Sequence, residues 1–266
     1  TSTSPSYQQS PNLLCGTIIG MKKLIIGNWK MNPKSAREAV LIGQAVKKGA
    51  SRYKKVETVI CPPYPFLYLI KGVTLGAQDV SSESGGARTG EVSAGMLKSI
   101  GVKYVIVGHS ERRAMGETYD TVNKKIKELV KEKITPVLCV GEKERDPHSH
   151  YLHVVKEELA AALRGISKNK ISGIVVAYEP IWAVGVLAKG ALDAEEALHM
   201  NIFIRKVVAD IAGAPAAKKL RVIYGGSVDA KNSGEFLATG KMDGLLVGRE
   251  SLDPKKFLEI VKTANN

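Results

Sequence analysis

The sequence predicts an α/β fold, a single closed (β/α)8 barrel, and three observations lead to this expectation. Short apolar segments rich in β-branched residues alternate with segments of helical periodicity, the pattern of a parallel sheet buried on both faces. Eight such apolar segments fit into 266 residues, a common length for one barrel domain. A hydrophobic content of 44% supplies one large core. The runner-up, an open doubly wound sheet, is less favoured because Asn28-Trp29-Lys30 stands where its glycine-rich first turn would be.

The expected strands are short and largely apolar. In chain order they are Leu24–Asn28, Thr58–Cys61, Thr74–Gln78, Tyr104–Val107, Thr135–Cys139, Ile174–Tyr178, Val222–Tyr224 and Gly244–Val247. Helical periodicity fills most of the gaps, at Ser35–Lys48, Tyr119–Lys133, Leu152–Leu163, Ala194–Ile211 and Pro254–Thr263. Two of these helices carry start signals, which are the capping pair Asp193 and Glu196 and the dipeptide Asp253-Pro254.

We expect one catalytic domain over residues 21–266, preceded by a disordered extension over residues 1–20. Thr1–Asn12 is rich in Ser, Thr, Pro and Gln and has no charged side chain, a composition that does not fold by itself. From Met21 onward strands and helices alternate without a low-complexity interruption. The extension has no basic segment ahead of its apolar stretch, so we do not interpret it as a signal peptide.

Composition narrows the class of function. The net charge is +13, but lysines are mixed with glutamates in most expected helices, so we do not expect nucleic-acid binding. The excess of positive charge is consistent with a soluble basic surface or with an electrostatic field that attracts a small anionic substrate. No apolar run reaches the roughly 18 residues of a membrane span, so we expect no membrane association. Three cysteines without CxxC spacing argue against a disulfide framework or a zinc site and fit a reducing, cytoplasmic setting.

A carboxylate stands at the end of one expected strand. Glu179 follows the apolar run Ile174–Tyr178 and precedes Pro180, so we expect the strand to end at Glu179 and to present this side chain at the rim of the sheet. A carboxylate held there and backed by apolar bulk suits a general base. A surface carboxylate that caps the turn beginning at Pro180 is the alternative interpretation.

Two further strand ends supply a cation and an imidazole. Asn28 and Lys30 share parity in an extended segment, so both side chains could point to one side and hold an anion. A lysine that snorkels from the strand end fits this segment as well. His109 opens an expected helical turn, where helix-start amides disfavour an imidazolium and a neutral imidazole could donate its N–H to a carbonyl oxygen. A structural histidine is the alternative, and Glu111 is expected to be a partner of Lys30.

Glycine-containing turns follow the last two expected strands, at Tyr224–Val228 and Val247–Ser251. Both could present backbone N–H groups at helix starts, which bind phosphate, and barrels often place a phosphate site after strands seven and eight. Either turn alone is also consistent with a plain tight turn. Together with the base, imidazole and cation, they indicate a cofactor-free, metal-free aldose–ketose isomerisation through an enediolate.

Four segments carry a family resemblance, and they occur in the expected order: Asn28–Asn32, Gly108–Arg113, Ala177–Gly185 and Tyr224–Val228. They closely resemble the triosephosphate isomerase family, and the likeness spans about residues 23–262. It implies a TIM barrel and a homodimeric intramolecular oxidoreductase that interconverts dihydroxyacetone phosphate and D-glyceraldehyde 3-phosphate in glycolysis and gluconeogenesis. It also implies the roles of the site residues. Glu179 would be the base, His109 the neutral electrophile and Lys30 the cation, with substrate contacts from Asn28, Lys30, Gly185, Ser227, Gly248 and Arg249.

The chain departs from the family pattern in two loops. After Gly185 the family usually continues with Thr-Gly-Lys, whereas this chain has Val186-Leu187-Ala188. That loop is the family's lid, so the alternative is a similar barrel with an altered lid and a changed substrate or reduced activity. In members of the family, the loop that matches residues 84–91 inserts into a second subunit. In this chain that loop has Arg88 where an aromatic residue is usual. Asp79 replaces a usual asparagine.

Replacing Val186-Leu187-Ala188 with Thr-Gly should raise turnover and reduce the loss of phosphate from the enediolate. The reason is that apolar side chains at an exposed lid tip, and a displaced hinge glycine, disturb the balance between open and closed lid. Steady-state kinetics of the two proteins measure this directly. Identical kinetic constants would contradict the importance of the lid sequence.

Overall fold

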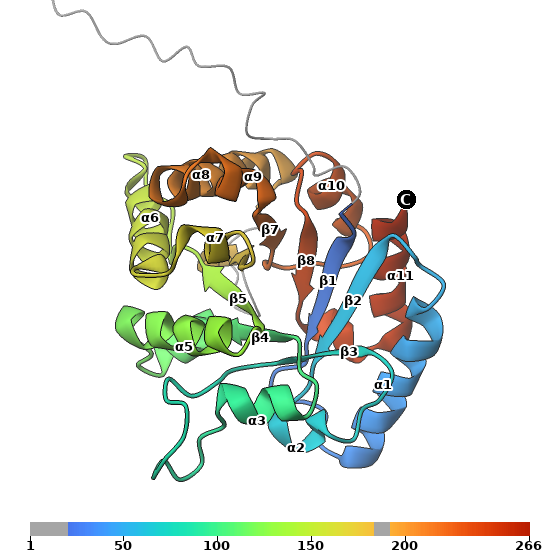
Figure 1. Ribbon diagram of the computed structural model, residues 1–266. Helices are drawn as coiled ribbons and strands as arrows, with labels where there is room; N and C mark the ends of the chain where they lie inside the picture. Colours follow the sequence, from blue (N-terminus) through green and yellow to red (C-terminus); the bar gives the residue numbers. More distant parts are fainter. Residues whose placement is uncertain (1–20, 184–191) are drawn as a thin grey trace, which may run out of the picture.

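The computed structural model describes residues 21–183 and 192–266. The expected extension over residues 1–20, Gly185 and the lid segment Val186-Leu187-Ala188 all lie outside the described residues. The described chain forms a closed barrel in which strands β1 to β8 follow one another in sequence order, with helices around them (Figure 1). The single (β/α)8 barrel expected from the sequence is therefore confirmed.

Every strand of the barrel runs parallel to both of its neighbours. The strands are β1 (Lys23–Asn28), β2 (Val56–Cys61), β3 (Thr74–Ala77), β4 (Tyr104–Val107), β5 (Thr135–Val140), β6 (Val175–Tyr178), β7 (Arg221–Tyr224) and β8 (Gly244–Val247). Each expected strand is present, with small shifts at its ends. One shift concerns the site, because β6 ends at Tyr178 and Glu179 is the first residue after the strand.

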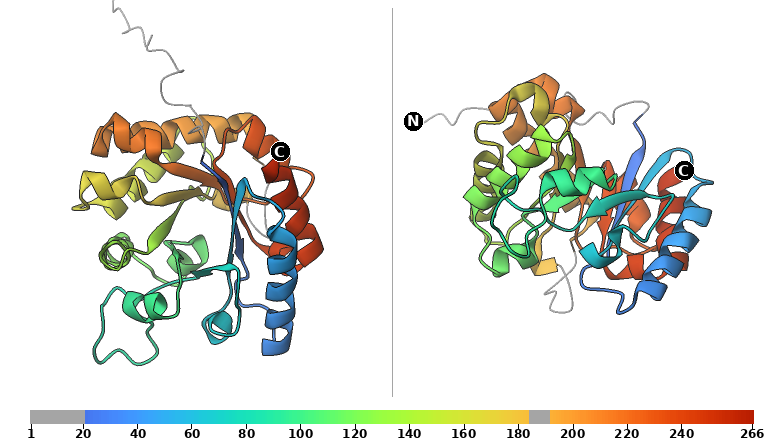
Figure 2. Two further views of the ribbon diagram at one scale, coloured as in Figure 1. Left: turned by 45° about the vertical axis from the view of Figure 1, so that its right-hand side comes forward. Right: turned by 60° about the horizontal axis from the view of Figure 1, so that its bottom comes forward.

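Helices cover the outside of the strands, as two further views also show (Figure 2). They are α1 (Ala36–Ala50), α2 (Tyr64–Leu67), α3 (Ala94–Ser99), α4 (Ser110–Ala114), α5 (Tyr119–Lys131), α6 (His150–Leu163), α7 (Lys168–Ile171), α8 (Ala194–Ala212), α9 (Ala214–Lys219), α10 (Ser233–Ala238) and α11 (Pro254–Asn265), with the 3-10 turns η2 (Ile181–Ala183) and η3 (Arg249–Leu252). Both start signals are used: Asp193 accepts the N–H of Glu196 at 2.7 Å, and Asp253 caps α11. Among the helices of the two described ranges, none is both long and apolar enough to cross a membrane.

The strands bury both of their faces, which explains why their sequences are continuously apolar rather than alternating. One set of strand residues fills the barrel interior, including Leu24, Ile26, Val59, Ile106, Val137 and Leu246. The residues between them, such as Ile25, Ile60, Val105, Leu138 and Leu245, face the helices in a second and larger cluster. These interior residues pack beneath the end of the barrel at which the strands terminate.

Candidate active site

One cavity of about 510 Å³ lies at the carboxyl ends of the strands. All described residues that the sequence selected line it, namely Asn28, Lys30, His109, Glu179, Ser227, Gly248 and Arg249. They come from the ends of β1, β4, β6, β7 and β8. The residues selected from the sequence are therefore brought together by the barrel. Gly185 is the exception that cannot be placed, because it lies outside the described residues.

The Glu179 side chain packs closely against its neighbours, in space left by a glycine. The side chain is buried, at 3% exposure, and its Oε1 lies 3.5 Å from Nε2 of His109. A Cβ atom on Gly225 would come within 2.7 Å of Cγ of Glu179, so only glycine leaves room for the carboxylate there. Within the described ranges Oε2 is buried and has no hydrogen-bond partner. Glu179 lines the cavity, and this oxygen has an unused capacity to accept a hydrogen bond or a proton.

Glu142 fixes Tyr178 and Trp182, the aromatic residues before and after Glu179 in the chain. It is buried after β5 and accepts hydrogen bonds from the Tyr178 hydroxyl at 2.9 Å and from Nε1 of Trp182 at 2.9 Å. Arg145 donates to the same oxygen at 2.7 Å and compensates its charge. Burial, followed by the Glu142 carboxylate, raises the pKa of Tyr178 well above its usual range, so its hydroxyl remains a donor. The segment around Glu179 is consequently anchored at two aromatic rings.

The two ring nitrogens of His109 have different hydrogen-bonding roles in this geometry. It is the N-cap of α4, and its Nδ1 accepts the backbone N–H of Glu111 at 3.2 Å. An acceptor Nδ1 leaves the proton on Nε2 and makes the ring neutral, since an imidazolium would place two donors against each other. The Glu111 carboxylate is farther from Nδ1, at 3.7 Å, and pairs with Lys30 instead. The neutral imidazole expected from the helix start thus presents Nε2–H toward Glu179.

Lys30 reaches the cavity through a backbone conformation that the sequence did not suggest. Its φ is +51°, in the left-handed region, rather than extended, so the shared parity of Asn28 and Lys30 is the wrong explanation for their proximity. Oδ1 of Asn28 accepts the Lys30 N–H at 3.1 Å, and Gln78 donates to the Lys30 carbonyl at 2.8 Å. These bonds offset a strain of about 1 kcal/mol. The Lys30 ammonium contacts Glu111 at 2.6 Å, as expected.

The two glycine turns differ in structure. After β8, η3 begins at Arg249, directly behind Gly248, so this turn does open a helical segment. After β7 the turn is not a helix start, because α10 begins only at Ser233. Ser227 instead faces the cavity with its hydroxyl donating to the Ala183 carbonyl at 2.9 Å. Both turns nevertheless line the same cavity.

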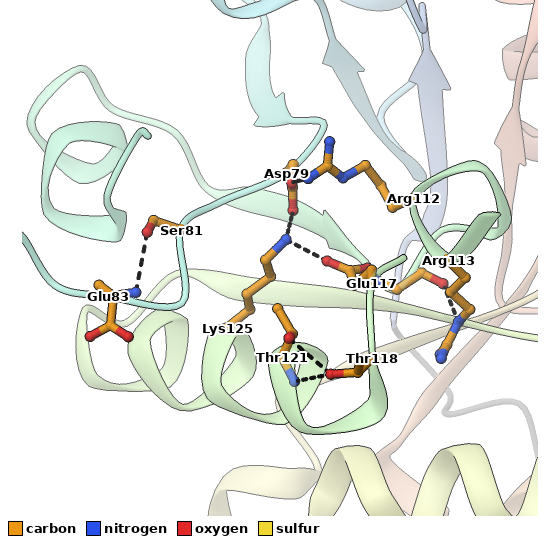
Figure 3. Close-up of polar contacts among 10 residues, drawn as sticks. Asp79, Ser81, Glu83, Arg112, Arg113, Glu117, Thr118, Thr121 and Lys125 are labelled. Atoms are coloured by element: carbon orange, nitrogen blue, oxygen red, sulfur yellow. Dashed lines mark hydrogen bonds and ion pairs between the residues drawn. The ribbon is translucent and has the colours of Figure 1, made fainter. Parts of the chain in front are cut away.

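A layer of charged residues behind the site, in which Lys125 and Glu117 are buried, was not identified from the sequence. Lys125 of α5 reaches between Asp79 and Glu117, and Arg112 lies on the other side of Asp79 (Figure 3). Glu117 in turn accepts the Gly108 N–H at 3.1 Å, directly before His109. The available signal was a lysine among the buried residues of an amphipathic helix, next to Val122 and Ile126. Asp79, noted as an unusual residue, is part of this layer.

The residues 21–183 and 192–266 contain no group of three or more His, Cys, Asp or Glu side chains that could hold a metal ion. The cavity brings together groups that can serve as an acid, a base and a cation. A barrel with a free carboxylate, a neutral imidazole donor, an ammonium and two glycine turns at one rim defines a class of enzyme, the isomerases that move a proton next to a carbonyl group.

Comparison with known proteins names the family. Residues 23–264 match the model of the triosephosphate isomerase family. The triosephosphate isomerase of Dictyoglomus turgidum is 40% identical over 91% of this chain and 99% of the relative. Those of Alkaliphilus oremlandii and Halorhodospira halophila are 41% and 42% identical over 90% and 91% of this chain and 98% of each relative. The chain belongs to the triosephosphate isomerase family and interconverts dihydroxyacetone phosphate and D-glyceraldehyde 3-phosphate, a step of glycolysis. These relatives give no support to the alternative of a changed substrate.

Replacing Lys125 with methionine should destabilise the fold by about 3–5 kcal/mol, because the carboxylate of Glu117 would stay buried without its cation and Asp79 would keep only Arg112. The side chains of Lys125 and Glu117 are 5% and 3% exposed, which makes the loss large. Urea unfolding measures it. Lys124→Met, on the exposed face of the same helix, is the control and should change stability by less than about 0.5 kcal/mol. Equal midpoints for the two variants would contradict the importance of this layer.

Proposed function

We propose that the isomerisation depends on Glu179 as the base, His109 as the electrophile and Lys30 as the cation. The Glu179 carboxylate removes a proton from the carbon beside the carbonyl group, and returns it to the neighbouring carbon. The hydroxyl proton moves between the two oxygens in the same sequence, so no proton is lost overall. The observation that supports this assignment is the buried Glu179 carboxylate in the same cavity as His109, with Oε1 3.5 Å from Nε2 of His109 and Oε2 without a hydrogen-bond partner among the described residues.

The negative charge of the enediolate develops on the two substrate oxygens. Nε2–H of His109 would donate to these oxygens, and the Lys30 ammonium would lie close enough to attract them. Next to the buried side chains of His109 and Glu179 such interactions are stronger than in water. Asn28 supports the reaction indirectly, because it holds the backbone of Lys30 through its side-chain oxygen.

The phosphate group would lie against the turns after β7 and β8. We assign its contacts to the hydroxyl of Ser227 and to the main-chain N–H groups of Gly248 and Arg249, with a further contact from Gly185. Lys30 is adjacent to this end of the cavity, since a Cβ on Gly248 would be 3.9 Å from Cε of Lys30. The formal net charge of +13 favours the approach of a phosphate dianion.

Glu179→Gln should lower kcat by about a thousandfold or more, because the amide cannot accept the proton while its shape is retained. A coupled assay with D-glyceraldehyde 3-phosphate measures this. Glu259→Gln changes the same charge on the exposed side of α11 and should leave kcat unaltered. Substantial turnover by Glu179→Gln would exclude this residue as the base.

We further propose that the protein acts in the cytoplasm as a homodimer, with residues 21–266 as its catalytic domain and residues 1–20 as an N-terminal extension of it. The loop between β3 and α3 supports the dimer, because it projects away from the barrel (Figures 1 and 2). Its residues 83–91 are exposed. Large apolar side chains are also exposed elsewhere, including Met31 at 93% and Met115 at 70%.

Light scattering at micromolar concentration should give twice the chain mass of 28.6 kDa. Deleting residues 85–90 should convert the protein to a monomer, because the projecting loop would no longer reach the second subunit. Substituting Gly173 with alanine at an exposed position should leave the assembly unchanged. A mass of one chain for the unaltered protein would contradict the dimer.

A further inference from the structure

A carboxylate that the reaction does not touch lies buried behind the site. Glu158 is on the inner face of α6, beside the buried residues Val155, Leu159 and Ala162, and is 4% exposed. Placing a carboxylate among apolar residues is unfavourable unless specific partners compensate for the lost water. The partners of Glu158 therefore indicate what it does.

Glu158 contacts two different loops with its two oxygens. Its Oε2 accepts the backbone N–H of Gly141, in the loop after β5, at 2.8 Å. Its Oε1 lies 3.6 Å from Nε of Arg113 on α4. One side chain thus joins the segment after β5 to the segment after β4.

Each of these partners contacts the segment that bears one member of the reacting pair. Nε of Arg113 donates to the carbonyl of Gly108 at 2.8 Å, and Gly108 directly precedes His109. Gly141 packs on the backbone of Glu179 so closely that a Cβ atom would be 1.9 Å from its carbonyl oxygen. The Glu179 N–H also donates to Val140 at 2.8 Å.

The contacts therefore run without interruption from His109 to Glu179. We propose that Glu158 is a positioning residue, whose ionised carboxylate ties the loop of His109 to the loop of Glu179 and so maintains their spacing. The proposal rests on the roles assigned to His109 and Glu179 above. It adds a residue from a helix that contributes nothing to the cavity wall.

The charge state of Glu158 decides the strength of this tie. Burial raises its pKa to about 7, against the opposing effect of Arg113 and the Gly141 N–H, and the carboxylates of Glu142 and Glu179 raise it further. The charged and titratable groups around it are thus Arg113 from α4, Glu142 and Glu179 from the loops after β5 and β6, and Tyr119 from α5. The pKa of Tyr119 is itself raised by burial first and by Glu158 second. Protonation removes the attraction for Arg113, so the tie is present above pH 7 and weakens below it.

Glu158→Gln tests the tie, because the amide keeps the shape and the acceptor for Gly141 but has no charge for Arg113. The kcat of the unaltered protein should rise with pH with an inflection near 7, which reports a group in the enzyme–substrate complex. We expect kcat of Glu158→Gln to lack this inflection and to be about tenfold lower at pH 8, since a small displacement of reacting groups costs this much. KM should change little, because the phosphate contacts assigned to Ser227, Gly248 and Arg249 follow β7 and β8.

Glu157→Gln is the matched control. It removes the same charge from the neighbouring, exposed position of α6 and should keep the full pH profile. Glu158→Asp is the second variant: it still titrates but is too short to reach both partners, so kcat should fall at every pH without a change in KM.

The same inflection in Glu158→Gln as in the unaltered protein would overturn the proposal, as would full kcat for Glu158→Asp. A purely structural role predicts altered unfolding without a change in the pH profile of kcat, and that result would also overturn it. These failures differ from failure of the proposed function, which would appear as turnover by Glu179→Gln whatever the Glu158 variants do.

Discussion

The pairing of β8 with β1 closes the barrel, and closure determines which side chains can meet. Leu24 pairs with Gly244, and the register continues to Gly27 and Val247. Gly244 is necessary at this seam because a Cβ atom would be 1.9 Å from the Leu24 carbonyl oxygen. With all strands parallel and the ring closed, every strand ends at the same rim. Residues far apart in the chain, such as Lys30 and Glu179, consequently line one cavity.

Within the cavity, hydrogen bonds fix the chemical state of the groups as well as their positions. The backbone N–H of Glu111 makes Nδ1 of His109 an acceptor, and this leaves Nε2–H as the donor. The Asn28 side chain holds Lys30 in its left-handed conformation. The site is therefore largely organised before substrate binds, which is the condition under which electrostatic stabilisation is most effective.

A second layer of charged residues supports this first layer from behind. Lys125 joins Asp79 to Glu117, and Glu117 holds the backbone just before His109. Glu158 and Arg113 form a separate connection toward Glu179. Buried charges of this kind contribute little net stability when complete, but removal of one member is costly. Their effect is to couple the loops after β3, β4, β5 and β6, so that the carboxylate and imidazole keep one relative position.

The sequence by itself determined the order of strands and helices, because burial of both sheet faces and helical amphipathicity leave local periodic signals. It also selected Glu179, His109 and Lys30 as candidates, because polar residues directly after apolar strands are a local pattern. Only the tertiary structure decided the φ of Lys30, the tautomer of His109 and the partners of Lys125 and Glu158. Each of these depends on contacts across the fold or on a backbone conformation that no periodicity encodes. The choice of candidate reacting groups thus rests on local information, whereas their arrangement results from closure of the barrel.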